Sequence, residues 1–127
     1  MKLKALLTGL SFIAVSGAFL IIGCSPSGKF GSAITITEET AIAAILDNPA
    51  SFEGKTVMVR GQIMTVDDDG LGFQLDNGVG SLLYVKVAGD FKIAQGAKYH
   101  LTAAEGKVRF DKDTEKPSLA ASGVEVK

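Results

Sequence analysis

The sequence has no second cysteine, no excess of positive charge and no cluster of histidines, and each absence excludes a class of protein. Because Cys24 is the only cysteine among 127 residues, no disulfide can form within the chain. His100 is the only histidine, and one imidazole cannot build a zinc site unaided. Lysine and arginine number 13 against 14 acids, so the chain lacks the phosphate-neutralising charge that drives non-specific binding to nucleic acid.

Motifs of catalysis are also missing. The sequence contains no nucleophile elbow and no phosphate-binding glycine loop before a helix, and Gly106-Lys107 matches no P-loop. No cysteine lies in the part of the chain expected to fold. We therefore expect a protein that is not an enzyme and that carries no cofactor and no metal.

The first residues have the pattern of a secretory signal. Lys2 and Lys4 form a short basic head, and an apolar run extends from 5 to 22, broken only by hydroxyl residues and glycines. It ends in Ile21-Ile22-Gly23-Cys24, which resembles the lipobox of bacterial lipoproteins. The resemblance implies cleavage between Gly23 and Cys24 and acylation of Cys24, which would then hold the protein on a lipid bilayer.

This interpretation also predicts a location. Ser25 follows the cysteine instead of the Asp that resembles an inner-membrane retention signal, which favours the outer membrane of the cell envelope where there is one. Cleavage removes Lys2 and Lys4 and no acid, which moves the net charge from −1 to −3. Two alternatives are an uncleaved signal anchor, for which the run is slightly short, and an inert cysteine in a core.

The boundaries follow from composition. Residues 1–23 are the predicted signal peptide, and 24–33 are the lipidated cysteine and a flexible tether rich in serine and glycine. Residues 34–127 suffice for one domain. At its start we expect a helix capped by Thr35 or Thr37, with Glu38 and Glu39 in the first turn and Asn48-Pro49 as its end.

The remainder predicts five short strands. Alternation places Val57, Val59 and Ile63 on one face, then 71, 73 and 75, then 83, 85 and 87, with turns at 67–70 and 76–78. In the fourth strand, opened by Gly96, we expect Tyr99 and Leu101 to face inward. Val108 has the opposite parity, and the fifth strand also switches. These switches predict bulges near 103–104 and 122–123 and a small closed barrel.

This pattern resembles the OB-fold domains of bacterial envelope proteins, including the group described as tRNA-anticodon-like. The resemblance rests on hydrophobic and glycine positions that specify shape: Asn48-Pro49, Phe52, Gly54-Lys55, Val57, Val59, Gly61, Gly72-Phe73, Leu75-Asp76, Gly106-Lys107-Val108, Leu119, Ala121, Val124 and Val126. It implies a mainly β, five-stranded OB-fold-like barrel with one N-terminal helix.

OB-folds usually bind ligands on the outer face of strands two and three and on the flanking loops. By parity, the candidate ligand face consists of Met58, Arg60, Gln62, Gln74, Leu82, Tyr84 and Lys86, with Met64 and Gly72 on the same side. We expect non-catalytic binding of an envelope protein, a glycan or a small ligand there. An ordinary solvated sheet face is the plain alternative.

Two further functions are possible alternatives. A single-stranded oligonucleotide needs several stacking aromatics and a positive groove, whereas this face offers Tyr84 and two cations, so its composition disfavours nucleic acid as a partner. Cation binding would use the carboxylates of 67–69, but consecutive acids on a turn point in different directions, and Asp is also a common turn residue.

The lipid anchor is directly testable. Replacing Cys24 by serine removes the acylated sulfur, and each acyl chain contributes about 0.8 kcal/mol of membrane affinity per buried CH₂. We expect the Cys24→Ser protein to stay unprocessed, with its apolar run uncleaved and no acyl chain at position 24. Cell fractionation and the mass of the N-terminal peptide measure this. A variant that matures normally and stays as firmly in the pellet would falsify the assignment.

Overall fold

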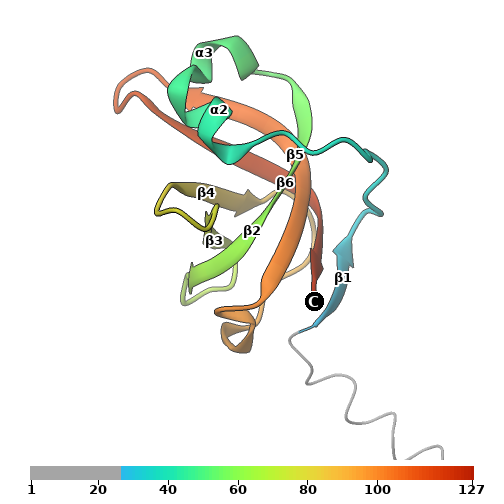
Figure 1. Cartoon of the computed structure of the whole chain (residues 1–127). Helices are drawn as coiled ribbons and strands as arrows, with labels where there is room; N and C mark the ends of the chain where they lie inside the picture. The colour runs from blue at the N-terminus through green and yellow to red at the C-terminus, as the bar shows by residue number, and fades with distance from the viewer. Residues whose placement is uncertain (1–26) are drawn as a thin grey trace, which may run out of the picture.

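Five strands close into a barrel in the computed structural model, which describes residues 27–127 (Figure 1). The predicted signal peptide, Cys24 and Ser25 lie outside the described residues. The barrel strands are β2 (Thr56–Val66), β3 (Gly72–Asp76), β4 (Leu82–Val87), β5 (Leu101–Asp111) and β6 (Lys116–Val126). They pair in the order β6-β4-β3-β2-β5-β6, all antiparallel except β4 with β6. This confirms the mainly β, five-stranded, OB-fold-like prediction.

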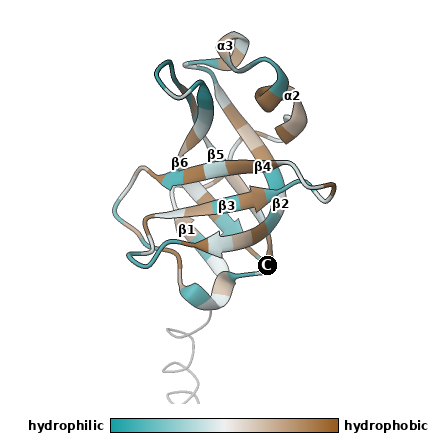
Figure 2. Ribbon diagram, turned by 90° about the vertical axis from the view of Figure 1, so that its left-hand side faces the viewer, coloured by the Kyte–Doolittle hydropathy of each residue, from teal (hydrophilic) through white to brown (hydrophobic). Residues whose placement is uncertain are grey.

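The barrel interior consists of the apolar side chains that alternation predicted on three of the strands. Val59, Ile63, Phe73, Leu75 and Val85 are completely buried. Figure 2 shows hydrophobic and hydrophilic residues alternating along the strands. Because successive side chains of a strand point to opposite faces, one face of each strand fills the core. Leu71 is the exception on this side, since it precedes β3 and is 39% exposed.

The last strand switches parity where the sequence predicted it. Leu119 and Ala121 face the core, and so do Val124 and Val126. The pairing of β5 with β6 shifts between Glu105 and Gly106, which leaves Ser122 as the extra residue of β6. Such a bulge bends the strand and increases its twist, which helps a short sheet to close.

The prediction for the fourth strand was wrong. Thr102, Ala104, Gly106 and Val108 all face inward with one unbroken parity, so β5 has no bulge at 103–104. Tyr99 and Leu101 point outward instead. Before β5 the chain forms a single turn of 3-10 helix, η1 (Gln95–Ala97), where the prediction placed the start of the strand.

A second bulge was not predicted, and it lies in β2. Ile63 pairs with Leu75 and Thr65 with Gln74, so Met64 is the extra residue. The shift lets both Ile63 and Val66 face the core.

The helical segment caps one end of the barrel, and it begins later than predicted. It consists of two short helices, α2 (Ile42–Asp47) and α3 (Pro49–Phe52), with Asn48 between them. Ile42 and Ile45 are buried against the barrel. The expected threonine cap was wrong: Ala41 precedes α2 without a side-chain cap, and no acid lies in its first turn. Among residues 27–127, no helix is both long enough and apolar enough to cross a membrane.

The region before α2 is extended because its backbone bonds to the outside of the barrel. Strand β1 (Gly28–Gly31) pairs antiparallel with Val126 to Gly123 of β6, so the predicted tether contributes a strand and the folded region starts before residue 34. At Gly31, where φ is +74°, an added Cβ would lie 2.4 Å from the carbonyl oxygen of Ser122. Only glycine fits this contact.

Residues 32–40, here called the strap, then cross β6, β5 and β2 in turn. The backbone N–H of Ser32 donates to the carbonyl of Ser122, and that of Thr40 donates to the carbonyl of Met58, each at 2.8 Å. Between them, one carboxylate oxygen of Glu105 accepts from the N–H groups of Thr35 and Ile36, both at 2.8 Å. The strap therefore satisfies its backbone by bonding to the barrel and cannot belong to a helix.

Removing the Glu105 carboxylate tests how firmly the strap is held. Glu105→Ala leaves the N–H groups of Thr35 and Ile36 without their acceptor, and we expect it to lower the free energy of unfolding by about 1–3 kcal/mol, typical of hydrogen bonds to a charged group. Urea unfolding of the domain measures the change. Glu38→Ala, an exposed acid on the strap itself, is the matched control and should shift the midpoint little. Equal effects of the two variants would contradict the role of Glu105.

Candidate binding site

The structure divides the predicted ligand face into separate places. Gln74, Leu82 and Tyr84 lie together on β3 and β4, where Gln74 is directly opposite Tyr84. Lys86 continues the outer face of β4 and is exposed, but it does not line the groove described below. The members on β2 lie elsewhere, and each has a local partner.

Met58 lies on the outward side of its strand, as predicted, but its place in an exposed ligand face was wrong. Its side chain is 1% exposed although it lies on the outer face of β2. Glu39 forms a parallel bridge to it, and the strap covers this part of the strand. The sequence could not show this because the covering residues were assigned to a helix.

Arg60 and Gln62 are occupied by neighbouring segments. The guanidinium of Arg60 lies 3.3 Å from the carboxylate of Glu39 on the strap, an exposed pair that contributes little stability. The Gln62 side-chain amide donates to the carbonyl of Tyr99 at 3.0 Å. A single surface joining Arg60 to Tyr84 therefore does not exist.

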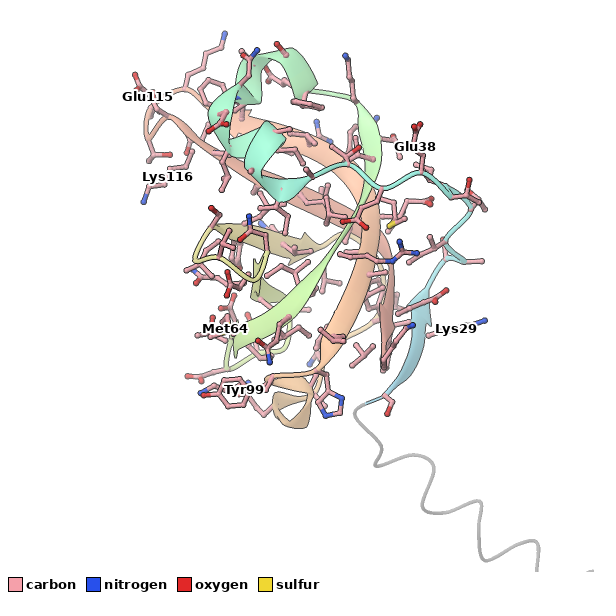
Figure 3. All side chains as sticks on the ribbon, viewed as in Figure 1. Lys29, Glu38, Met64, Tyr99, Glu115 and Lys116 are labelled. Carbon is pink, nitrogen blue, oxygen red and sulfur yellow. The ribbon has the colours of Figure 1, made fainter. Side chains whose placement is uncertain are left out.

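The remaining members line an open groove of about 590 Å³, within the size range of ligand sites. Its floor is the outer face of β3 and β4, one wall is Leu46 of α2, and the other is the hairpin between β5 and β6. The lining residues are Leu46, Gln74, Leu82, Tyr84, Asp111, Thr114, Lys116, Pro117 and Ser118. Figures 1 and 3 show α2 and this hairpin, with Glu115 and Lys116 at its tip, at the same end of the barrel.

Sequence reasoning missed the hairpin residues and Leu46. The signal for the hairpin was available, because OB-folds use the loop between their last two strands as well as the sheet face. The Asp111–Lys116 stretch reads as a mixed-charge loop, and only the closed barrel brings it beside β4. No sequence signal places Leu46 in the groove, because its position depends on where α2 packs against the barrel.

The groove is apolar at its surface and carries one charge of each sign. Leu46, Leu82 and Pro117 provide aliphatic contacts, and Leu82 is 44% exposed. Asp111 and Lys116 are opposite one another in the β5–β6 ladder, so their charges offset. A groove of several lysines and arginines, which an oligonucleotide would need, does not form here.

Tyr84 is fixed by the hairpin turn between β2 and β3. Its hydroxyl donates to a carboxylate oxygen of Asp67 at 2.5 Å, and its ring crosses over Gly72, where an added Cβ would lie 1.9 Å from the Tyr84 hydroxyl oxygen. Glycine at 72 is therefore required for the ring to lie flat on β3. The side-chain amide of Gln95 donates to the carbonyl of Asp67 at 2.7 Å and holds the turn from the other side.

The hydrogen bond to Asp67, followed by partial burial and the charges of Asp67 and Asp69, raises the pKa of Tyr84 to about 12 from its ordinary value of 10.0. Ionisation of the phenol would remove the donated proton and place two negative charges side by side. The hydroxyl is therefore protonated across the physiological range and acts as a positioned neutral group.

Two carboxylates of the acidic turn accept hydrogen bonds within the barrel. Asp67 accepts from Tyr84, and a carboxylate oxygen of Asp69 accepts from the N–H of Leu71 at 2.9 Å. Across residues 27–127, no three groups of the histidine, cysteine or carboxylate kind come together as metal ligands. The hairpin's own bonds account for two of the three carboxylates.

The tyrosine pKa leads to a test. Because the pKa of Tyr84 is raised in the folded state, the stability that its protonated hydroxyl gives the fold is fully present below pH 10. This stability is lost as the pH rises through about 12. The Tyr99→Phe variant leaves Tyr84 as the only tyrosine, so its phenolate absorbance can be titrated directly. We expect a midpoint about two units above that of a free phenol.

Adding Asp67→Asn to this variant supplies the control. It removes the carboxylate acceptor and its charge, so the midpoint should fall toward 10.0. An unchanged midpoint would show that Asp67 is not the cause of the shift.

Several solved structures share the fold at low sequence identity. The hypothetical protein ygiW from E. coli superposes with a TM-score of 0.52 and 11% identity, covering 77% of this chain and 99% of that one. An OBody, AM1L10, bound to hen egg-white lysozyme gives 0.53 and 16%, covering 75% and 96%. A putative aspartyl-tRNA synthetase from Leishmania major Friedlin gives 0.53 and 17%, covering 87% of this chain but 26% of that one.

No protein-family model and no curated protein sequence matches the chain. At 11–17% identity, the structural matches establish the architecture and leave the ligand to be argued from the groove. The chain is thus a five-stranded OB-fold-like barrel similar to the E. coli protein along almost the whole length of the latter.

Proposed function

We propose that this protein is a lipid-anchored, non-catalytic binding module of the bacterial cell envelope, which takes a protein partner in the groove between α2 and the β5–β6 hairpin. The observation that carries the binding role is a group of apolar side chains, exposed Leu82 with partly buried Leu46 and Pro117, beside the fixed ring of Tyr84. Apolar side chains gathered in a concave surface are typical of interaction sites.

The charge of the groove supports a protein over the other candidates. One aspartate and one lysine face each other across the hairpin, a combination that suits the mixed polar rim of a protein interface. A similar fold can make protein contacts, because the OBody is bound to lysozyme. An oligonucleotide would find one cation in the groove, and stacking would depend on Tyr84 alone.

The anchor comes from the sequence. Ile21-Ile22-Gly23-Cys24 has the form of a lipobox, and strand β1 begins four residues after Cys24. The lipid places the barrel at a membrane surface, outside the cytoplasm, and the outer membrane is favoured because Ser25 follows the cysteine. Anchoring confines the groove to partners that reach the same surface.

A charge placed in the groove tests the proposal. Leu82→Asp puts a carboxylate at the centre of the apolar contact, where burying it against a partner is costly. Crosslinking in the native envelope, followed by identification of the attached proteins, should lose the partner that the unaltered protein retains. Urea unfolding checks that the variant is folded.

Val79→Asp is the matched control, because Val79 is an exposed aliphatic residue, 82% accessible, on the loop between β3 and β4 and outside the groove. It should keep the partner. Recovery of the same partner with Leu82→Asp would argue against the groove, and Arg60→Ala should behave like the control because Arg60 lies beside the strap.

A further inference from the structure

Two large apolar side chains are exposed at the end of the barrel opposite to the groove. Tyr99 is 58% exposed and Leu101 is 63% exposed. The ammonium of Lys98 lies 5.1 Å from the centre of the Tyr99 ring. Figure 3 shows Tyr99 at the end away from α2 and the β5–β6 hairpin. We call Lys98, Tyr99, Leu101 and Lys127 the lower rim.

The backbone of Tyr99 is held in a conformation that bulky residues rarely adopt. Its φ is +72°, in the left-handed region. Two hydrogen bonds to β2 maintain it: the Tyr99 N–H donates to the carbonyl of Ile63 at 2.6 Å, and the Gln62 side chain donates to the Tyr99 carbonyl at 3.0 Å. An exposed aromatic residue at a strained position is a feature that function often explains.

The lower rim lies beside the start of β1, where the predicted anchor enters. Gly28 is opposite Val126, and Val126 is opposite Thr102 on its other side. With neighbouring strands about 4.8 Å apart, Gly28 is about 10 Å from Thr102, the residue after Leu101. Lys127 bonds through its N–H to the carbonyl of Leu101 at 2.9 Å. Gly28, Leu101 and Lys127 are therefore neighbours.

The predicted lipid attachment lies within short reach of this place. Cys24 precedes Gly28 by four residues. Four extended residues span at most about 14 Å, so an acyl chain on Cys24 would enter the bilayer close to the lower rim. A tether of this length does not let the barrel stand clear of the membrane surface.

The charges at this end are mixed. Lys29, Lys98 and Lys127 are exposed here, but Glu125 is opposite Lys29 in the β1–β6 ladder. Asp68 and Asp69 also lie near, beside Gln95 of η1. Attraction to an anionic surface is therefore weak, and the contact depends on the amphipathic side chains. Tyrosine and lysine place an apolar body in the interface and keep the polar end in water.

We infer that the lower rim inserts into the headgroup layer of the membrane that holds the anchor, with Tyr99 and Leu101 as the apolar contacts. This inference rests on the proposed lipidation of Cys24. It orients the barrel, because α2 and the β5–β6 hairpin lie at the other end (Figure 1). The groove then faces away from the bilayer, toward partners that approach the anchored protein from the side opposite to the membrane.

Tryptophan fluorescence tests the inference in the intact lipoprotein. The chain has no tryptophan, so Tyr99→Trp and Leu82→Trp each introduce a single reporter, one in the lower rim and one in the groove. Each acylated protein is reconstituted into vesicles of phosphatidylethanolamine and phosphatidylglycerol, with or without brominated acyl chains. We expect severalfold stronger quenching by the brominated lipid for Tyr99→Trp than for Leu82→Trp.

Leu101→Trp serves as a second rim reporter in regular strand backbone, in case the strained position 99 does not tolerate tryptophan. Flotation of the vesicles separates the two hypotheses. If the proteins do not float with vesicles, the lipid anchor and hence the proposed membrane attachment fail. If the proteins float and the rim reporters are quenched no more than Leu82→Trp, the anchor stands and only the insertion of the lower rim is overturned. The insertion is also overturned if an added envelope protein alters the fluorescence of the rim reporters and the lipid does not.

Discussion

The pairing of β6 with three strands is the constraint on which the rest of the structure depends. Its first half lies between β4 and β5, and its second half lies between β1 and β5. Each pairing satisfies backbone groups that would otherwise be left without partners beside the core. Because Ser122 is an extra residue, both halves direct side chains inward although the strand bends between them. Without the bulge, one half would expose Leu119 and Ala121 or Val124 and Val126.

Closure through β6 also places the groove and the lower rim at opposite ends. The β5–β6 hairpin is brought beside β4 and forms a wall of the groove with α2. The far end of β6 pairs with β1, so the chain that precedes β1 reaches the barrel at this end. The strap then joins the two ends across the outside and covers Met58. The proposed partner groove and the proposed membrane-facing rim thus both depend on one strand.

Much of the barrel could be predicted because it depends on local alternation. Val57, Val59, Ile63, Phe73, Leu75, Leu83 and Val85 occupy the core as their spacing indicated, and the parity change in β6 marked its bulge. Alternation failed at Tyr99, which precedes β5, and at Leu101, because β5 turns the polar Thr102 and not Leu101 toward the core. The capping residues also gave a wrong helix start, since Glu39 pairs with β2 and Glu105 accepts hydrogen bonds from the strap. Long-range backbone bonds overrode a local signal in each case.

By itself, the sequence determined the class of fold, the number of barrel strands and the acidic character of the chain, because these depend on side-chain period, turn residues and composition. It also contained the lipobox-like pattern, which is a property of consecutive residues. The tertiary structure alone decided which outward residues share a surface. Leu46, Tyr84 and Pro117 meet in one groove, while Arg60 lies apart beside Glu39. The reason is physical: parity fixes the face of a strand on which a side chain lies, but only barrel closure and the path of the strap decide what lies beside it.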